Sequence, residues 1–171
     1  QGPTSAPVDI RANNLSVESA GQFVVGTSAG RGDIAVEGEN SEIHAKKLHI
    51  GTQANNNILG ALAVKDGYFG IGADGIVTSR LKPRRPMFTM ENGTLAAEAD
   101  FKLSNYGMNL PFGSPAKGGK VEFDLNGKNV KWQTSLAGGS DVTIKGAGSF
   151  SPERPGIQGI PTGKWKVEST G

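Results

Sequence analysis

The sequence predicts an all-β chain, built as an elongated β-jellyroll or a solenoid-like stack of short, mostly antiparallel strands. Apolar and polar residues alternate over many short runs. The 171 residues include 26 glycines spread along the whole length, and glycine weakens a helix interior by roughly 1 kcal/mol each. Asn-Gly and Asp-Gly pairs lie between the alternating runs, and such pairs are the strongest short-range signal for hairpins. Helix should therefore be scarce.

The alternating runs predict the individual strands, because a period of two buries one face of a strand and leaves the other in water. Thr94–Asp100 is the best helical candidate, but it runs directly into an alternating segment, so we do not favour a helix there. Turn signals at 66–67, 74–75, 92–93 and 126–127 predict sequential, antiparallel connections. The predicted strands include residues 8–10, 15–17, 34–36, 48–50, 101–103, 121–125, 130–132, 142–144 and 165–167.

We expect a single domain over residues 1–171, with one candidate seam at 80–86. Two prolines flank a basic cluster in this segment, which is either a solvated loop or a contact for an anion or lipid phosphate. The chain has a net charge of +2, from 18 basic and 16 acidic residues that are interspersed. This mixture lacks the concentrated positive field of a nucleic-acid binder, so we expect no nucleic-acid partner.

No motif of catalysis, cofactor binding or metal binding stands out. Gly70–Gly75 fits the G-x-G-x-x-G pattern, but no predicted helix follows to hold a pyrophosphate. His44 and His49 lie at outward positions without a third ligand at fixed spacing, and the chain has no cysteine. We therefore expect a binding protein without a cofactor, metal site or catalytic residue, and not an enzyme.

Three stretches of the first fifty residues carry three different patterns in order. Residues 6–15 contain Pro-apolar-x-Ile-x-Ala-Asn, residues 32–38 contain Gly-Asp-apolar-x-apolar, and residues 41–50 contain apolar-x-Ala-Lys-Lys-apolar-x-apolar. This succession resembles the OstA-like periplasmic domain family of lipopolysaccharide export. A weaker echo extends the resemblance over residues 6–110, and residues 111–171 remain a β extension without a counterpart.

The resemblance implies a β-jellyroll whose apolar trough shields acyl chains of lipopolysaccharide or phospholipid in the periplasm. It also implies that edge strands pair with other envelope transport proteins, or end to end with a second copy. For each trough residue the alternative is ordinary core packing. By this analogy the trough residues are Ile10, Leu15, Val17, Ile34, Val36, Ile43, Leu48, Ile50, Phe88, Met90, Phe101 and Leu103.

Two other classes of function remain open from the sequence. A surface-exposed β-solenoid adhesin, of the autotransporter or two-partner secreted type, would account for the glycine-rich turns. The Arg31-Gly32-Asp33 tripeptide resembles integrin-binding loops, although it is also ordinary turn chemistry. A glycan-active enzyme on a β-helix is the third alternative. We expect a periplasmic location for the transport protein and the cell surface for the adhesin.

Overall fold

The computed structural model describes residues 8–12, 16–25, 32–50, 60–78, 88–103, 109–111, 118–132, 135–152 and 163–168, and all regular elements in them are β-strands. They are β1 (Val8–Ala12), β2 (Ser16–Val25), β3 (Gly32–Val36), β4 (Glu42–Ile50), β5 (Gly60–Val64), β6 (Tyr68–Thr78), β7 (Phe88–Met90), β8 (Gly93–Ala97), β9 (Phe101–Leu103), β10 (Asn109–Pro111), β11 (Lys120–Asp124), β12 (Lys128–Trp132), β13 (Ser135–Ala137), β14 (Asp141–Lys145), β15 (Gly148–Pro152) and β16 (Trp165–Val167).

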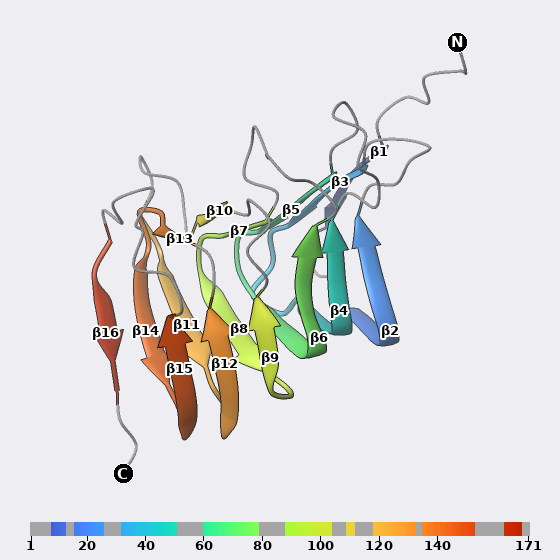
Figure 1. The fold of residues 1–171 in the computed structure, drawn as a ribbon. Coiled ribbons are helices and arrows are strands. Elements are labelled where there is room, and N and C mark those ends of the chain that lie inside the picture. The colour runs from blue at the N-terminus through green and yellow to red at the C-terminus, as the bar shows by residue number, and fades with distance from the viewer. Residues whose placement is uncertain are drawn as a thin grey trace.

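The strands stack in parallel as a β-solenoid (Figure 1). The longest sheet has seven strands in the order β16-β14-β11-β8-β6-β4-β2, and we call it the long sheet. A second sheet has the order β1-β3-β5-β7, a third has the order β15-β12-β9, and β10 pairs with β13. The chain thus passes from sheet to sheet and returns beside its own earlier strand, as in other solenoids with repeats of about 20 to 50 residues.

The predicted all-β class and the solenoid-like stacking are confirmed, whereas the antiparallel pairing and the jellyroll are wrong. Each strand pairing is parallel. The Asn126-Gly127 turn shows the reason: both residues have positive φ, 47° and 73°, and Lys128 N donates to Leu125 O over 2.8 Å. This tight turn joins β11 to β12, which belong to different sheets. Turn chemistry bends the chain but does not decide which strand becomes its neighbour.

The alternating runs predicted as strands lie in strands wherever the structure describes them, except that Leu125 follows the end of β11. Residues 94–97, part of the helical candidate, belong to β8. Leu15 and the 80–86 seam lie outside the described residues. Strands of the 120–167 region continue the same long sheet that β2 to β8 begin, so this region extends the stack. In the described part of the chain no helix is long and apolar enough to cross a membrane.

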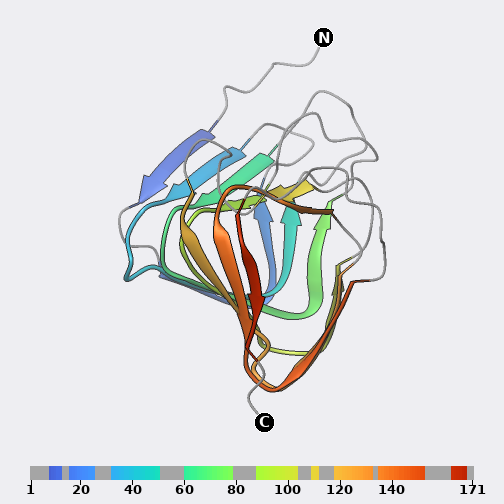
Figure 2. The same ribbon diagram turned by 90° about the vertical axis from the view of Figure 1, so that its left-hand side faces the viewer.

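The core lies in the interior that the sheets enclose (Figure 2). In the long sheet, residues in register stack on one another and form an inward row. The middle of this row is buried, and its last member is 72% exposed. Aromatic rings fill the C-terminal part of the core, where Phe123, Trp132 and Phe150 lie in mutual contact at centroid distances of 5.6 to 5.7 Å. The inward row consists of Val17, Ile43, Phe69, Leu95, Phe123, Ile144 and Val167.

Hydrogen bonds between successive rungs also hold the corner that leads into the long sheet. Tyr68 N donates to Ser41 O, and Thr94 N donates to Gly67 O, both over 2.8 Å. Farther along, the buried Ser140 hydroxyl donates to Glu91 O over 2.8 Å and accepts from Gly119 N over 3.2 Å. These contacts satisfy backbone groups that no strand ladder reaches, so the corner keeps each rung in register with the next.

Candidate functional site

The residues predicted to line a lipid trough lie mainly in the closed interior. Of those whose side chains the structure describes, Val17 and Ile34 are partly buried and pack against the core. Ile10 and Leu103 belong to β1 and β9, and Leu15 lies outside the described residues. Seven have exposed fractions of 5% or less and belong to one core cluster, namely Val36, Ile43, Leu48, Ile50, Phe88, Met90 and Phe101.

These seven side chains contact other core residues, as the alternative of ordinary core packing expects. Phe88, for example, lies 5.6 Å from the Phe69 ring, centroid to centroid. A cluster packed in this way gains from dispersion contacts and from the removal of apolar surface from water. Lipid binding by these residues stays a prediction, and it would require the interior to open.

The outer surface of the long sheet carries polar residues in two rows. One row runs through Glu42, Tyr68 and Thr94, which are in register on β4, β6 and β8. The neighbouring row runs through Glu18, His44 and Gly70 on β2, β4 and β6. Because side chains in register on adjacent parallel strands are close neighbours, the solenoid brings residues from distant parts of the sequence to one place.

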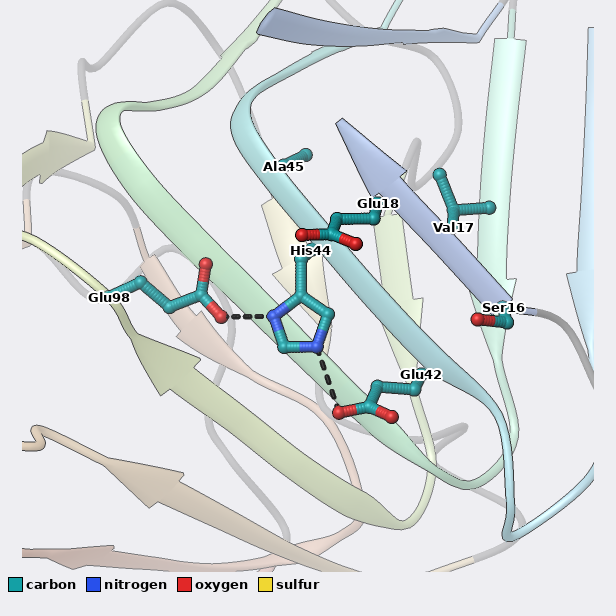
Figure 3. A pocket seen from close by; sticks show the side chains of 7 residues that line it. All are labelled: Ser16, Val17, Glu18, Glu42, His44, Ala45 and Glu98. Atoms are coloured by element: carbon teal, nitrogen blue, oxygen red, sulfur yellow. Dashed lines mark hydrogen bonds and ion pairs between the residues drawn. The ribbon is translucent and has the colours of Figure 1, made fainter. Parts of the chain in front are cut away.

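His44 is the centre of this polar surface (Figure 3). Its Nε2 lies 2.9 Å from Glu42 Oε1, and its Nδ1 makes a short contact with Glu98 Oε1. The Tyr68 ring lies 5.2 Å from the imidazole, centroid to centroid. The two carboxylates approach the ring from opposite sides, as Figure 3 shows. We call His44, Glu42 and Glu98 the His44 triplet.

Glu98 reaches His44 because the intervening strand carries a glycine at the crossing point. A Cβ built on Gly70 would lie 2.0 Å from Glu98 Oε1, which shows that the carboxylate lies directly over this residue. The backbone of Glu98 is fixed as well, because its N donates to Ile71 O over 2.8 Å. Any side chain at position 70 would therefore displace the Glu98 carboxylate.

The electrostatics of the surface favour a protonated histidine. The hydrogen bond to Glu42 raises the pKa of His44, and Glu98 raises it further, while burial lowers it by a smaller amount than the raising effects together. His49 differs, because burial and the nearby Lys47 lower its pKa. Burial raises the pKa of the Tyr68 hydroxyl, with added contributions from Glu98, Asp124 and Glu42. At neutral pH the tyrosine is thus a neutral hydrogen-bonding group.

The His44 triplet borders an open hollow of about 450 Å³. Its polar lining offers carboxylate oxygens, which accept hydrogen bonds and attract positive charge. Among the described residues, no group of three or more His, Cys, Asp or Glu side chains is arranged to hold a metal ion. The hollow is lined by Ser16, Val17, Glu18, Glu42, His44, Ala45 and Glu98.

His44 was predicted to point outward, and it does so in the structure. Its contacts with Glu42 and Glu98 were not predicted. Glu98 is 54 positions away in the chain, and no local motif connects the two residues. The missing signal is the spacing of the parallel rungs. Once Ile43, Phe69 and Leu95 are known to be in register, the positions of the outward residues next to them are known as well. An antiparallel interpretation of the turns hides this spacing.

A second hollow, of about 300 Å³, lies at the β16 end of the solenoid and is more apolar. It includes Ile144, Phe150 and the exposed Val167. The Gly32-Asp33 part of the adhesive tripeptide lies in β3, between β1 and β5, where Asp33 is in register with Asp9 and Ala61. These two residues begin the strand, and Arg31 lies outside the described residues.

No protein-family model, curated protein or solved structure matches the chain.

Proposed function

We propose that this chain is a surface-exposed binding protein of the β-solenoid adhesin type, which recognises cell-surface glycans with the outer face of its long sheet and performs no reaction. The observation that carries the proposal is the contrast between the two faces of this sheet. Its inward row is apolar and buried in its middle, whereas its outward rows hold the His44 triplet beside an open hollow.

The architecture supports an elongated binding protein because stacked parallel rungs create a long, regular outer surface. Solenoid proteins commonly use such extended surfaces for recognition. The seven strands of the long sheet present outward positions in register from Ser16 to Lys166. The hollow that we propose as the binding site lies at the N-terminal rungs of this surface, beside β2 and β4.

A glycan suits the chemistry of the hollow. Glu18 and Glu42 can accept hydrogen bonds from sugar hydroxyl groups, and the half-buried Tyr68 ring offers an apolar surface beside them. A hydrogen bond to a charged group contributes about 1.5–3 kcal/mol. Loss of one such contact should weaken binding by roughly ten- to a hundredfold.

The test is binding of the labelled chain to an array of immobilised glycans, followed by affinity measurement on the best ligand. Glu18→Gln should weaken binding at least about tenfold by the estimate above. Glu122→Gln is the matched control, since Glu122 is an outward carboxylate on the same sheet that pairs with Lys145 away from the hollow. Absence of glycan binding by the unchanged chain, or an equal loss in both variants, would refute the proposal.

Lipid transport in the periplasm is the second candidate, and the apolar hollow at the β16 end favours it. Each methylene group moved from water into such a site gains about 0.8 kcal/mol. In this case the outer edge of β16, which has no partner among the described strands, would pair with another envelope transport protein or a second copy. The acyl chains of lipopolysaccharide or a phospholipid would occupy the hollow.

Native mass spectrometry of the chain purified from a Gram-negative host tests this candidate. Val167→Asp is a suitable variant because the side chain is 72% exposed and its replacement should not disturb folding. Co-purified lipid that disappears in this variant would support transport. A protein that carries no lipid and takes up none when lipid is added would exclude it.

A further inference from the structure

The arrangement around His44 requires two N–H donors on one imidazole ring. Nε2 faces Glu42 and Nδ1 faces Glu98. A neutral imidazole has one N–H and one lone pair, whereas the protonated ring has two N–H groups. Only the protonated ring can donate to both carboxylates, because a neutral ring would direct a lone pair at one of the two oxygens.

The contact with Glu98 joins rungs that are not adjacent. His44 lies on β4, Glu98 directly follows β8, and β6 lies between these strands in the long sheet. The Glu98 carboxylate crosses β6 over Gly70, where a Cβ would lie 2.0 Å from its Oε1. The crossing is thus a side-chain bridge in addition to the backbone ladder, and it depends on one glycine.

The groups that face the ring are mostly acidic. Glu18 from β2 lines the same hollow, Glu42 comes from β4 itself, and Glu98 comes from the end of β8. Tyr68 on β6 is a further titratable neighbour. Among the described residues that line the hollow, none is Lys or Arg. When the imidazole loses its proton, these carboxylates face one another without a compensating charge, and repulsion between them favours release of Glu98 toward solvent.

We propose that His44 acts as a pH-operated staple of the solenoid, closed on Glu98 when the ring is protonated and open when it is neutral. Opening exposes Gly70 and enlarges the hollow beside Glu18. The direction follows from the carboxylate at each ring nitrogen, which only the protonated ring can satisfy: the staple is closed at low pH and opens as the pH rises through the raised pKa of His44. The staple is a property of the fold; only its effect on ligand binding rests on the proposed function.

The experiment is an NMR titration of the ligand-free chain, which has only two histidines. The His44 ring should titrate at higher pH than the His49 ring, which serves as an internal control with a lowered pKa. The amide signals of Gly70 and Glu98 should shift with the His44 midpoint. Their protection factors, which are corrected for the general rise of amide exchange with pH, should fall above that midpoint. Chemical shifts of the Gly70 and Glu98 amides that do not change with the His44 titration would overturn the proposal.

Two variants separate the staple from a histidine that is merely close to acidic groups. Glu98→Gln should move the His44 midpoint to lower pH and remove the pH dependence of the Gly70 protection factor. Gly70→Ala should give the same result by blocking the crossing. Glu122→Gln should leave both unchanged, because Glu122 pairs with Lys145 outside the hollow. An unaltered His44 midpoint and an unaltered pH dependence of the Gly70 protection factor in Glu98→Gln would refute the staple, whether or not the chain binds glycans.

Discussion

Truncation of Leu95 to alanine should test whether the interior is a packed core. Leu95 is fully buried at the centre of the inward row, in register with Phe69 on one side and Phe123 on the other. Leucine-to-alanine changes in packed cores cost about 2–5 kcal/mol, and the cost is greatest where the neighbours cannot collapse into the cavity. Both neighbouring side chains are fully buried and anchored on paired strands, so we expect a loss of about 4 kcal/mol.

The free energy of unfolding can be measured by urea denaturation, followed by far-ultraviolet circular dichroism and by the fluorescence of Trp132 and Trp165. A loss of about 4 kcal/mol is a large part of the roughly 5–15 kcal/mol that stabilises a typical domain. Leu95→Met keeps the volume and should cost less than about 1.5 kcal/mol. Val167→Ala, at the exposed end of the same row, should change stability by no more than about 0.5 kcal/mol.

An open trough would give a different pattern. If Leu95 faced a space that lipid or water can fill, its truncation would leave no closed cavity, and the cost would approach that of the exposed Val167 variant. A loss below about 1 kcal/mol for Leu95→Ala, with an unchanged denaturant slope, would therefore refute the packed interior.

Three further predictions concern the corners, the histidines and the surface. Gly127→Ala should cost about 1–2 kcal/mol of stability for its positive φ alone, since no atom lies within 4 Å of the added Cβ. Gly93→Ala should cost more, because its Cβ would also lie 2.2 Å from Gly67 O. Urea denaturation of both variants measures the difference. His44→Gln should be less stable than the unchanged chain at low pH, and this difference should disappear as the pH rises above 6.5 through the raised pKa of His44. His49→Gln should instead gain stability relative to the unchanged chain as the pH falls below 6.5. Denaturation midpoints measured across this pH range give the sign of both effects. Lys145→Gln should cost about 0–1 kcal/mol, and less in high salt, because its pair with Glu122 is partly exposed to solvent. A larger cost in thermal denaturation would contradict this prediction.

The class of fold could be predicted from the sequence because alternation and glycine content act locally. Runs such as Val121–Leu125 and Val142–Ile144 alternate clearly, and the structure has strands there. Strand β6 was harder to predict, since Gly70, Gly72 and Gly75 interrupt its pattern and Asp74-Gly75 suggests a hairpin. In the structure Asp74-Gly75 lies within β6, where the register with β4 shifts at a bulge, and the residues from Gly75 onward pair with β4 again. The Asp-Gly signal therefore marked an irregularity in the strand, but the hairpin that it predicted is absent.

Parallel pairing could not be recognised from single turns. It depends on whether apolar positions recur at the same place in segments that lie one rung apart in the sequence. The paired residues Ile43, Phe69 and Leu95 illustrate this agreement: each is apolar and each precedes an outward residue of different chemistry. The apolar members are interchangeable in the core, so they leave only a weak repeat in the sequence. The outward members differ freely, which hides the repeat further.

The same freedom explains why a functional site in this fold belongs on the outside. The core constrains every inward position to an apolar side chain of suitable size, whereas an outward position can vary without loss of the stack. Gly70 departs from this expectation, because an outward strand position gains nothing in stability from glycine, which weakens strands. Its absent side chain admits the Glu98 carboxylate to His44. A residue that is unfavourable for the strand but necessary for the triplet indicates that the triplet contributes something besides the fold, and the glycan and pH experiments address what that is.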